Sequence, residues 1–329
     1  MSSATKPFSV AMRDRQLQWA LDGGVPSAAL QERKGKPFWV LKSEHRSLNL
    51  FRSDWWDYIA GSEHRWASAL NSSQCFGVNL FAPLADDSVR AKRFLGLLIS
   101  DRKIEQQDRV AVRFEHTPNG APEWLGERGQ PTQVDVFFEI TRAGDSVGFV
   151  LVEVKFTESS FGSCRGWNGK HSGMWTNPNR ARCQNAAELV RSPQTQCWLA
   201  EAEGRRYWEI LSRPSSSLRM DQIGHAGACP FRHGLYQMMR NRVMADELSS
   251  RVPGTWTEFV VCRHPHNDVL SNLKEPIAGS GNAFEAFRTL SSVNAVRDWN
   301  AEELVGLVGS TDDDLSKWKA WMNGRYFSL

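Results

Sequence analysis

The pattern that most constrains the fold is a succession of three strand-like segments between residues 109 and 156. RVAVRFEH (109–116) and QVDVFFEI (133–140) alternate apolar and polar residues, and SVGFVLVEVKF (146–156) is almost continuously apolar. Alternation is typical of a half-buried strand, and a continuous apolar run is consistent with a fully buried one. The turn residues AGD (143–145) separate the last two segments, and this spacing predicts an antiparallel hairpin.

Helical patterns surround these strands. Apolar residues recur at helical spacing in residues 8–20, 55–72, 89–101 and 229–248, and again in three short segments after about residue 282. TEFVVCRHP (257–265) predicts one further strand. The order of elements is therefore helix, three strands, a long insertion, helix and strand. This order predicts an α/β or α+β fold in which helices flank a mixed central sheet.

We expect four regions along the chain. They are an N-terminal arm (1–54), a core (55–160 and 229–280), a cysteine-bearing insertion (161–228) and a helical C-terminal segment (281–329).

Composition excludes several classes of protein. With 329 residues, 41% hydrophobic and 23% charged, the chain is that of a globular protein with a sizeable core. No apolar run approaches the ~20 residues that a membrane-spanning helix needs, and the first residues lack the layout of a signal peptide. We therefore expect a cytoplasmic protein that does not enter a membrane. Six scattered cysteines favour a reducing compartment, and a net charge of +3 predicts no partner by itself.

Charged residues interrupt the most apolar strand. Glu153 and Lys155 lie two positions apart, so in a strand they point to the same face. The predicted hairpin brings Asp135 close to them. Two carboxylates and an intervening backbone carbonyl form an oxygen site that suits Mg²⁺, and a neighbouring lysine stabilises charge that develops on a phosphate. The alternative interpretation is a surface salt bridge at the end of a strand.

This arrangement, Asp-x17-Glu-x-Lys within that order of elements, resembles the PD-(D/E)xK nuclease superfamily with its restriction-endonuclease-like fold. The resemblance covers about residues 55–160 and 229–265. The segments SSQCFGVNLFAPL, EVKFTESSFGSC and CPFRHGLYQMMRN are also similar to those of bacterial restriction endonucleases in this superfamily. The chain departs from the name-giving pattern, because Val134 and not proline precedes Asp135.

The resemblance implies roles for individual residues. Asp135 and Glu153 would bind Mg²⁺ or Mn²⁺, and Lys155 would be the catalytic lysine. Many members add an acid from the first helix, for which Glu63 is the candidate here. RecB-like members carry a glutamine or tyrosine on the helix after the third strand, which corresponds to Gln237 or its neighbour Tyr236. The alternative for Glu63 and Gln237 is that they are ordinary solvated residues on helices.

The insertion and its boundary carry Cys164, Cys183, Cys197 and Cys229. None of them forms a Cys-x-x-Cys pair, so their spacing says little about zinc. Resemblance to RecB-like and Cas4-like nucleases implies a 4Fe–4S cluster; Zn²⁺, or ordinary buried thiols, are the alternatives. A rival metal set is Cys262, His264 and His266, which alternation places on one face of a strand.

Basic and aromatic residues are interleaved in the same insertion. The basic candidates for nucleic-acid binding are Arg165, Lys170, Arg180, Arg182 and, on the following helix, Arg240. Basic groups bind phosphates, while Trp167, Trp175 and His171 offer rings for stacking on unpaired bases. The alternative is a solvated loop that its tryptophans anchor to the body of the protein.

Together these features predict an Mg²⁺-dependent nuclease that acts on DNA, single- or double-stranded, in restriction, phage defence or repair. A homodimer or a partner from a defence system is a mechanistic expectation, because one active site cuts one strand at a time. The alternatives are a non-catalytic nucleic-acid-binding protein on the same fold and an unrelated partner-binding protein with a tryptophan-rich surface.

Overall fold

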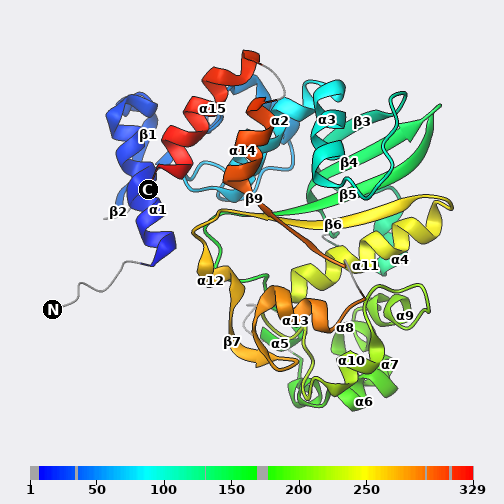
Figure 1. Ribbon diagram of the computed structural model, residues 1–329. Coiled ribbons are helices and arrows are strands. Elements are labelled where there is room, and N and C mark those ends of the chain that lie inside the picture. The colour runs from blue at the N-terminus through cyan, green and yellow to red at the C-terminus, as the bar shows by residue number, and fades with distance from the viewer. Residues whose placement is uncertain are drawn as a thin grey trace.

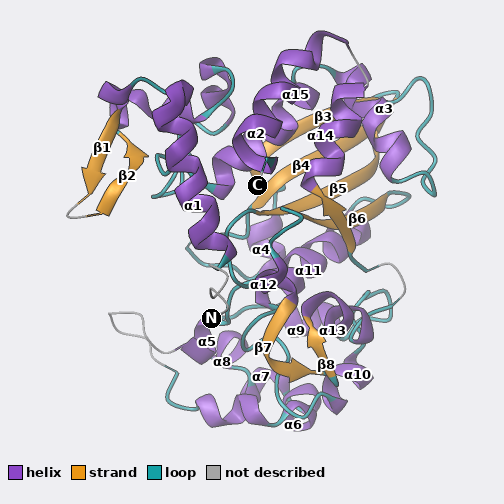
Figure 2. Cartoon of the chain, turned by 60° about the vertical axis from the view of Figure 1, so that its left-hand side comes forward, coloured by secondary structure: helices purple, strands orange, loops and turns teal. Residues whose placement is uncertain are grey.

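The structure is a computed structural model, and it describes residues 7–33, 36–129, 131–168, 177–292, 295–310 and 313–328. A mixed β-sheet runs through the molecule, with one group of helices above it and a second group below it in Figure 1. Figure 2 shows a separate hairpin, β1 (Leu30–Arg33) and β2 (Lys36–Leu41), well away from this sheet.

The central sheet has five strands in the order β3-β4-β5-β6-β9. They are β3 (Arg109–His116), β4 (Val134–Arg142), β5 (Asp145–Lys155), β6 (Trp256–Arg263) and β9 (Arg297–Asn300). The β3–β4 and β4–β5 pairs are antiparallel, whereas β5–β6 and β6–β9 are parallel. The hairpin and the mixed sheet flanked by helices, both predicted from the sequence, are confirmed. β9 was not predicted, because four residues give too short a pattern to detect.

The register of the hairpin determines which charged residues meet. Val136 lies opposite Val152, and by continuation Asp135 lies opposite Glu153. Odd-numbered residues of β5 such as Leu151 pack into the core on one face, and even-numbered residues such as Val152 pack into the core on the other. Glu153 and Lys155 therefore emerge on the same face as Leu151.

One face of the sheet is covered by α2 (Ser73–Ala85), α3 (Ser88–Leu98), α14 (Ala301–Ser310) and α15 (Ser316–Met322). Their core is rich in stacked and edge-on rings, among them Phe81, Phe94 and Phe138. α2 lies very close to β5, because a side chain at Gly77 would meet Val154 at 3.4 Å. This contact sets the second turn of α2 against β5 near its end.

The prediction of helices over residues 55–72 was wrong. Ser53–Tyr58 is a 3₁₀ helix, turns follow it, and the long helix α2 begins only at Ser73. The Ser72 hydroxyl caps it by accepting from the Cys75 backbone nitrogen. α2 is buried on all sides, from Gln74 to Leu84, so it lacks the polar face that a periodicity search needs.

The opposite face carries α11 (Tyr236–Arg251), α13 (Ala283–Thr289) and the short α4 (Ala121–Leu125). The helix predicted over 229–248 starts at Tyr236, seven residues later than expected. Residues 229–235 instead pair with the segment after β5, since the Cys164 nitrogen donates to the Arg232 carbonyl at 3.0 Å. α11 thus begins beside the end of β5.

The insertion packs below α11 as a set of short helices (Figure 1). These are α5 (Arg165–Asn168), α6 (Ala186–Arg191), α7 (Pro193–Gln196), α8 (Trp198–Glu201), α9 (Tyr207–Leu211) and α10 (Met220–His225). Trp198, Trp208 and Phe231 share one apolar core with Met238 of α11. α12 (Asp268–Ser271) and the hairpin of β7 (Asn272–Ile277) and β8 (Ser280–Asn282) border it. The insertion is thus continuous with the lower core.

The two ends of the described chain meet. α1 (Phe8–Trp19) contacts the last turn, Asn323–Phe327, where Arg325 is fully buried. Its guanidinium donates to Gln16 at 2.9 Å and to the Leu70 carbonyl at 3.0 Å. In the part of the chain that the structure describes, no helix combines the length and the apolar character needed to cross a membrane.

Candidate functional site

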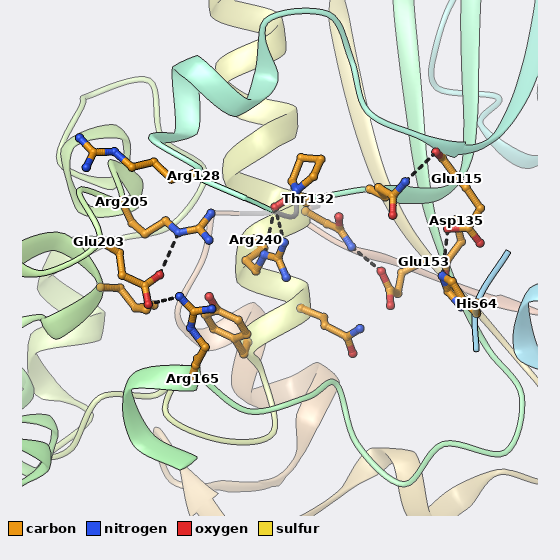
Figure 3. A pocket seen from close by; sticks show the side chains of 16 residues that line it. His64, Glu115, Arg128, Thr132, Asp135, Glu153, Arg165, Glu203, Arg205 and Arg240 are labelled. Atoms are coloured by element: carbon orange, nitrogen blue, oxygen red, sulfur yellow. Dashed lines mark hydrogen bonds and ion pairs between the residues drawn. The ribbon is translucent and has the colours of Figure 1, made fainter. Parts of the chain in front are cut away.

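A pocket of about 350 Å³ lies beside α11, at the C-terminal ends of β3 and β5 and the N-terminal end of β4 (Figure 3). One end is acidic and is lined by Glu115 from β3, Asp135 from β4 and Glu153 from β5. The other end is basic and is lined by Arg128, Arg165, Arg205 and Arg240. Figure 3 shows the two groups on opposite sides, with Thr132 between them.

The structure brings together Asp135, Glu153 and Lys155, which the sequence singled out. Glu153 and Lys155 are each 4% exposed, and Lys155 Nζ lies 2.6 Å from Glu153 Oε1. Asn241 of α11 donates from Nδ2 to Glu153 Oε2 at 2.6 Å. One oxygen of Asp135 accepts from the Val154 backbone nitrogen at 2.7 Å. Both oxygens of Glu153 are therefore held, and the Asp135 carboxyl is fixed to the neighbouring strand.

The charges in this end of the pocket shift one another's pKa values. Burial and then the charges of Glu153 and Glu115 raise the pKa of Asp135 well above its usual value. Burial acts to lower the pKa of Lys155, but the nearby carboxylates, Glu153 foremost, outweigh it and raise that pKa. The site thus holds a cationic lysine and a carboxyl that resists ionisation, which is the electrostatic signature of an excess of acids.

Glu115 is a member of the acidic end that the sequence reasoning missed. Its backbone has a φ of 46°, in the left-handed region, while the unshifted β3–β4 register between the pairs Phe114–Val136 and His116–Val134 puts it opposite Asp135. A left-handed backbone is strained for a residue other than glycine, and such strain is often found at functional sites. The only signal in the sequence is an acid near the end of a strand beside Asp135.

Neighbouring residues orient Glu115. Gln74, in the first turn of α2, donates to Glu115 Oε1 at 2.8 Å and accepts from the His64 backbone nitrogen at 2.9 Å. The His64 ring lies 3.2 Å from Glu115 Oε2, and this contact raises the pKa of His64. Gln74 and His64 are therefore positioning residues for Glu115.

Glu63, expected as the additional acid on the first helix, does not line the pocket. It lies in a loop, where it accepts from the Gly61 backbone nitrogen at 2.8 Å and pairs with Arg46 at 3.1 Å. Gln237 does line the pocket, next to Gly162, and so does Tyr236. The structure thus places Gln237 beside the site and Glu63 outside it.

The basic end is assembled around Glu127, whose side chain is completely buried. Arg205 lies 3.0 Å and Arg240 3.7 Å from its Oε1 atom. The Tyr207 hydroxyl donates to the same oxygen, and Thr132 contacts both the carboxylate and Arg240. Sequence reasoning identified Arg240 but not Glu127 or Arg205, which come together only through the fold.

The other basic candidates lie elsewhere. Arg165 lines the pocket and pairs with Glu203. Arg180 and Arg182 do not line it; Arg180 covers the Trp167 ring, and Arg182 pairs with Glu201 at 2.8 Å. Their role in DNA binding stays a prediction. Lys170, His171 and Trp175 lie outside the described residues.

The four insertion cysteines, Cys164, Cys183, Cys197 and Cys229, are all free thiols and gather in one region. Burial and then the charges of the other three cysteines raise the pKa of Cys229, and burial with Cys197 raises that of Cys183 to about 11. Thiols from four separate segments thus lie close enough to influence one another. Among the described residues, however, no group of three or more His, Cys, Asp or Glu side chains is arranged to hold a metal ion.

The rival metal set of Cys262, His264 and His266 was wrong. His264 is fully buried, and its Nε2 atom lies 3.0 Å from the Tyr326 carbonyl. Its Nδ1 atom accepts from the His266 backbone nitrogen at 3.3 Å. Both ring nitrogens are thus occupied, and the ring stacks on Phe327, so this histidine anchors the C-terminal turn.

The geometry agrees with what comparison with known proteins shows. A family model described as "Restriction Endonuclease associating with ARP" matches residues 28–327. The chain belongs to this family. Its members are restriction endonucleases, so a nuclease role that acts on nucleic acid in defence is the function class of this protein. No curated protein and no solved structure matches the chain.

Proposed function

We propose that this family member is a PD-(D/E)xK-type endonuclease that hydrolyses DNA with a bound Mg²⁺ or Mn²⁺. Asp135 and Glu153 would bind the metal, with Glu115 beside them, and Lys155 would assist the reaction. The observation that carries the proposal is the meeting of three strand-borne carboxylates and one buried lysine at the end of a polar pocket. DNA is the favoured substrate because the family is one of restriction endonucleases.

The residues at the acidic end fit a hard divalent cation. Asn241 is 2% exposed, and its Oδ1 atom is buried without a hydrogen-bond partner. An unsatisfied buried oxygen beside Glu153 is costly unless water or a cation occupies the space next to it. Mg²⁺ commonly uses only one or two protein carboxylates and keeps several waters, so it does not need a preformed cage of three or more side chains. Burial and then the charges of Glu153 and Glu115 raise the pKa of Asp135, and a cation would relieve the repulsion between these charges.

The residues around the acidic end have separate tasks in this proposal. A bound metal would supply Lewis-acid chemistry and acidify a water. Lys155, held cationic by Glu153, donates hydrogen bonds toward charge that develops on the scissile phosphate. Asn241 fixes the Glu153 carboxylate, and Gln74 fixes Glu115, so neither must reorganise during the reaction.

Incubation of the purified protein with duplex DNA, single-stranded DNA and RNA tests the proposal. We expect cleavage of DNA in Mg²⁺ or Mn²⁺ and no cleavage in EDTA, because the proposed hydrolysis requires a bound divalent cation. Cleavage that persists in EDTA would contradict the proposal, and binding without cleavage in any metal would favour the non-catalytic alternative. The dependence of the cleavage rate on protein concentration tests the expected homodimer. Addition of the partner that the family description abbreviates as ARP tests whether cleavage requires a partner.

We also infer that the four insertion cysteines bind an iron–sulfur cluster. A single Zn²⁺ needs sulfurs about 2.3 Å from one point, and no described group has an arrangement of that kind. A cluster of several irons spreads its thiolate ligands more widely. The Cys229 nitrogen donates to the Cys183 carbonyl at 2.8 Å, and burial followed by the charges of the other three thiols raises the pKa of Cys229, so the four thiols are neighbours that a cluster could bridge.

Anaerobic purification tests this inference. We expect a brown protein with about four iron atoms per chain, and loss of the iron in Cys229→Ser. Cys75→Ser is the matched control, because Cys75 is also buried but lies in α2 on the other face of the sheet. Iron content by elemental analysis and the visible spectrum are the measurements. A colourless preparation without iron, with or without zinc, would contradict it, and so would equal iron loss in both variants.

A further inference from the structure

The basic end of the pocket is built rather than incidental. We call Arg128, Arg165, Arg205 and Arg240 the arginine wall. Glu127, fully buried, holds Arg205 and Arg240 from behind. A buried carboxylate is unfavourable unless it is well paired, and here Thr132 and Tyr207 complete its hydrogen bonds. The fold therefore uses a buried charge to fix two guanidinium groups that face the pocket.

The arginine wall has more positive charge than its own partners neutralise. Four guanidinium groups face two carboxylates, Glu127 and Glu203, which leaves two surplus positive charges. Arg165 is 53% exposed although it pairs with Glu203, and Arg128 is exposed and has no ion pair with any described residue. Guanidinium groups bind phosphate through paired hydrogen bonds. The two surplus positive charges therefore suit one phosphate group that carries one or two negative charges.

The two ends of the pocket are complementary in charge. At the acidic end, three carboxylates line the pocket, and the ammonium of Lys155 pairs with one of them, Glu153. A cation at that end attracts one phosphate of a strand, while the arginine wall attracts another directly. Cavities of roughly 300–1,000 Å³ hold a single small molecule, so a pocket of about 350 Å³ accommodates one nucleotide and not a duplex.

We propose that the arginine wall is a second phosphate subsite, which binds a phosphate neighbouring the scissile one on a single DNA strand. The pocket then holds one nucleotide of the cleaved strand between the subsite and the metal-binding carboxylates. The statement that the bound ligand is the cleaved DNA strand rests on the proposed function. The subsite itself rests on the buried Glu127 and on the surplus of guanidinium groups.

Binding of a fluorescein-labelled 12-nucleotide DNA strand, measured by anisotropy in EDTA and again in Ca²⁺, tests the subsite. The variant is the double substitution Arg128→Ala, Arg165→Ala. The matched control is Arg191→Ala, Arg219→Ala, which removes the same charge from two arginines of the insertion that are 67% and 51% exposed and lie outside the pocket. All four side chains are on the surface, so each double variant retains the fold.

We expect the pocket double variant to raise the Kd at least about 10-fold. The slope of log Kd against log salt concentration should fall by about 0.7 for each phosphate that the variant no longer binds. The control should stay within about twofold of wild type. Equal effects of the two double variants would show that only overall charge matters and would overturn the subsite. Inorganic pyrophosphate that binds as tightly as the strand would also overturn it, since the site would then serve a free anion.

The same variants separate this inference from the proposed function. If wild type cuts DNA and the pocket variant retains the same kcat/KM, the subsite is wrong and the nuclease function stands. If no metal supports cleavage but strand binding still depends on Arg128 and Arg165, the nuclease function is wrong. The subsite then stands as a binding site for single strands.

Discussion

Asp135→Asn is expected to lower metal-dependent cleavage at least about 1,000-fold, because the bound metal contributes several kcal/mol to the reaction. The same substitution is expected to raise the melting temperature of the metal-free protein. Asparagine keeps the oxygen that accepts from the Val154 nitrogen, yet removes a charge that burial, Glu153 and Glu115 all disfavour. Cleavage rates in Mg²⁺ and thermal unfolding in EDTA measure the two effects.

The direction of the stability change follows from the raised pKa of Asp135. A carboxyl whose pKa is higher in the folded than in the unfolded chain favours the folded state only while it is protonated. As pH rises from about 3.9 through the raised folded pKa, that contribution is lost. The loss amounts to about 1.4 kcal/mol for each pH unit that separates the folded pKa from the unfolded one. We therefore expect the stability advantage of Asp135→Asn at pH 7 to shrink as pH falls toward 4.

Metal addition supplies the control. Wild type should gain about 2.7 kcal/mol in unfolding free energy when the metal is at 100 times its Kd, and Asp135→Asn should gain little. The order of stability then reverses between EDTA and Mn²⁺. An asparagine variant that Mn²⁺ stabilises as much as wild type would remove Asp135 from the metal site. One that is less stable than wild type in EDTA would contradict the raised pKa of Asp135.

Much of the sheet could be predicted from the sequence, because its strands carry local signals. The hairpin of β4 and β5 follows from two apolar runs around a Gly-containing turn, and its register then brings Asp135 opposite Glu153. β6 was found for the same reason. α2 was not, because a helix that is buried on every side has no polar face to define its period. The strand pattern thus located the acid–lysine centre, whereas the helix beside it needed the structure.

The rest of the pocket depends on contacts between residues far apart in the chain. Glu127 meets Arg205 and Arg240, and Asn241 meets Glu153 across 88 positions. No local pattern encodes such pairs. Glu115 escaped for a different reason: it meets Asp135 only through the register of β3 against β4, which no local pattern determines.

Glu115→Gln compared with Glu63→Gln decides which acid supplements Asp135 and Glu153. The sequence favours Glu63, and the structure favours Glu115. Glu115→Gln is expected to lower cleavage about 10- to 100-fold, the range typical of residues that tune a metal site, whereas Glu63→Gln should leave the rate within about twofold. Both substitutions remove one carboxylate at nearly constant volume. Cleavage rates at saturating Mg²⁺, and the Mg²⁺ concentration at half-maximal rate, measure the difference.

A readout that does not depend on activity accompanies this comparison. The Glu115 carboxylate raises the pKa of His64, so Glu115→Gln should return that pKa toward about 6.5. Glu63→Gln should leave it unchanged, since Glu63 pairs with Arg46 instead. Titration of the His64 ring by NMR in the metal-free protein measures the shift. Loss of cleavage in Glu63→Gln, together with an unchanged His64 pKa in both variants, would restore Glu63 to the site. The loop that holds Glu63 would then have to move toward the carboxylates when the metal binds.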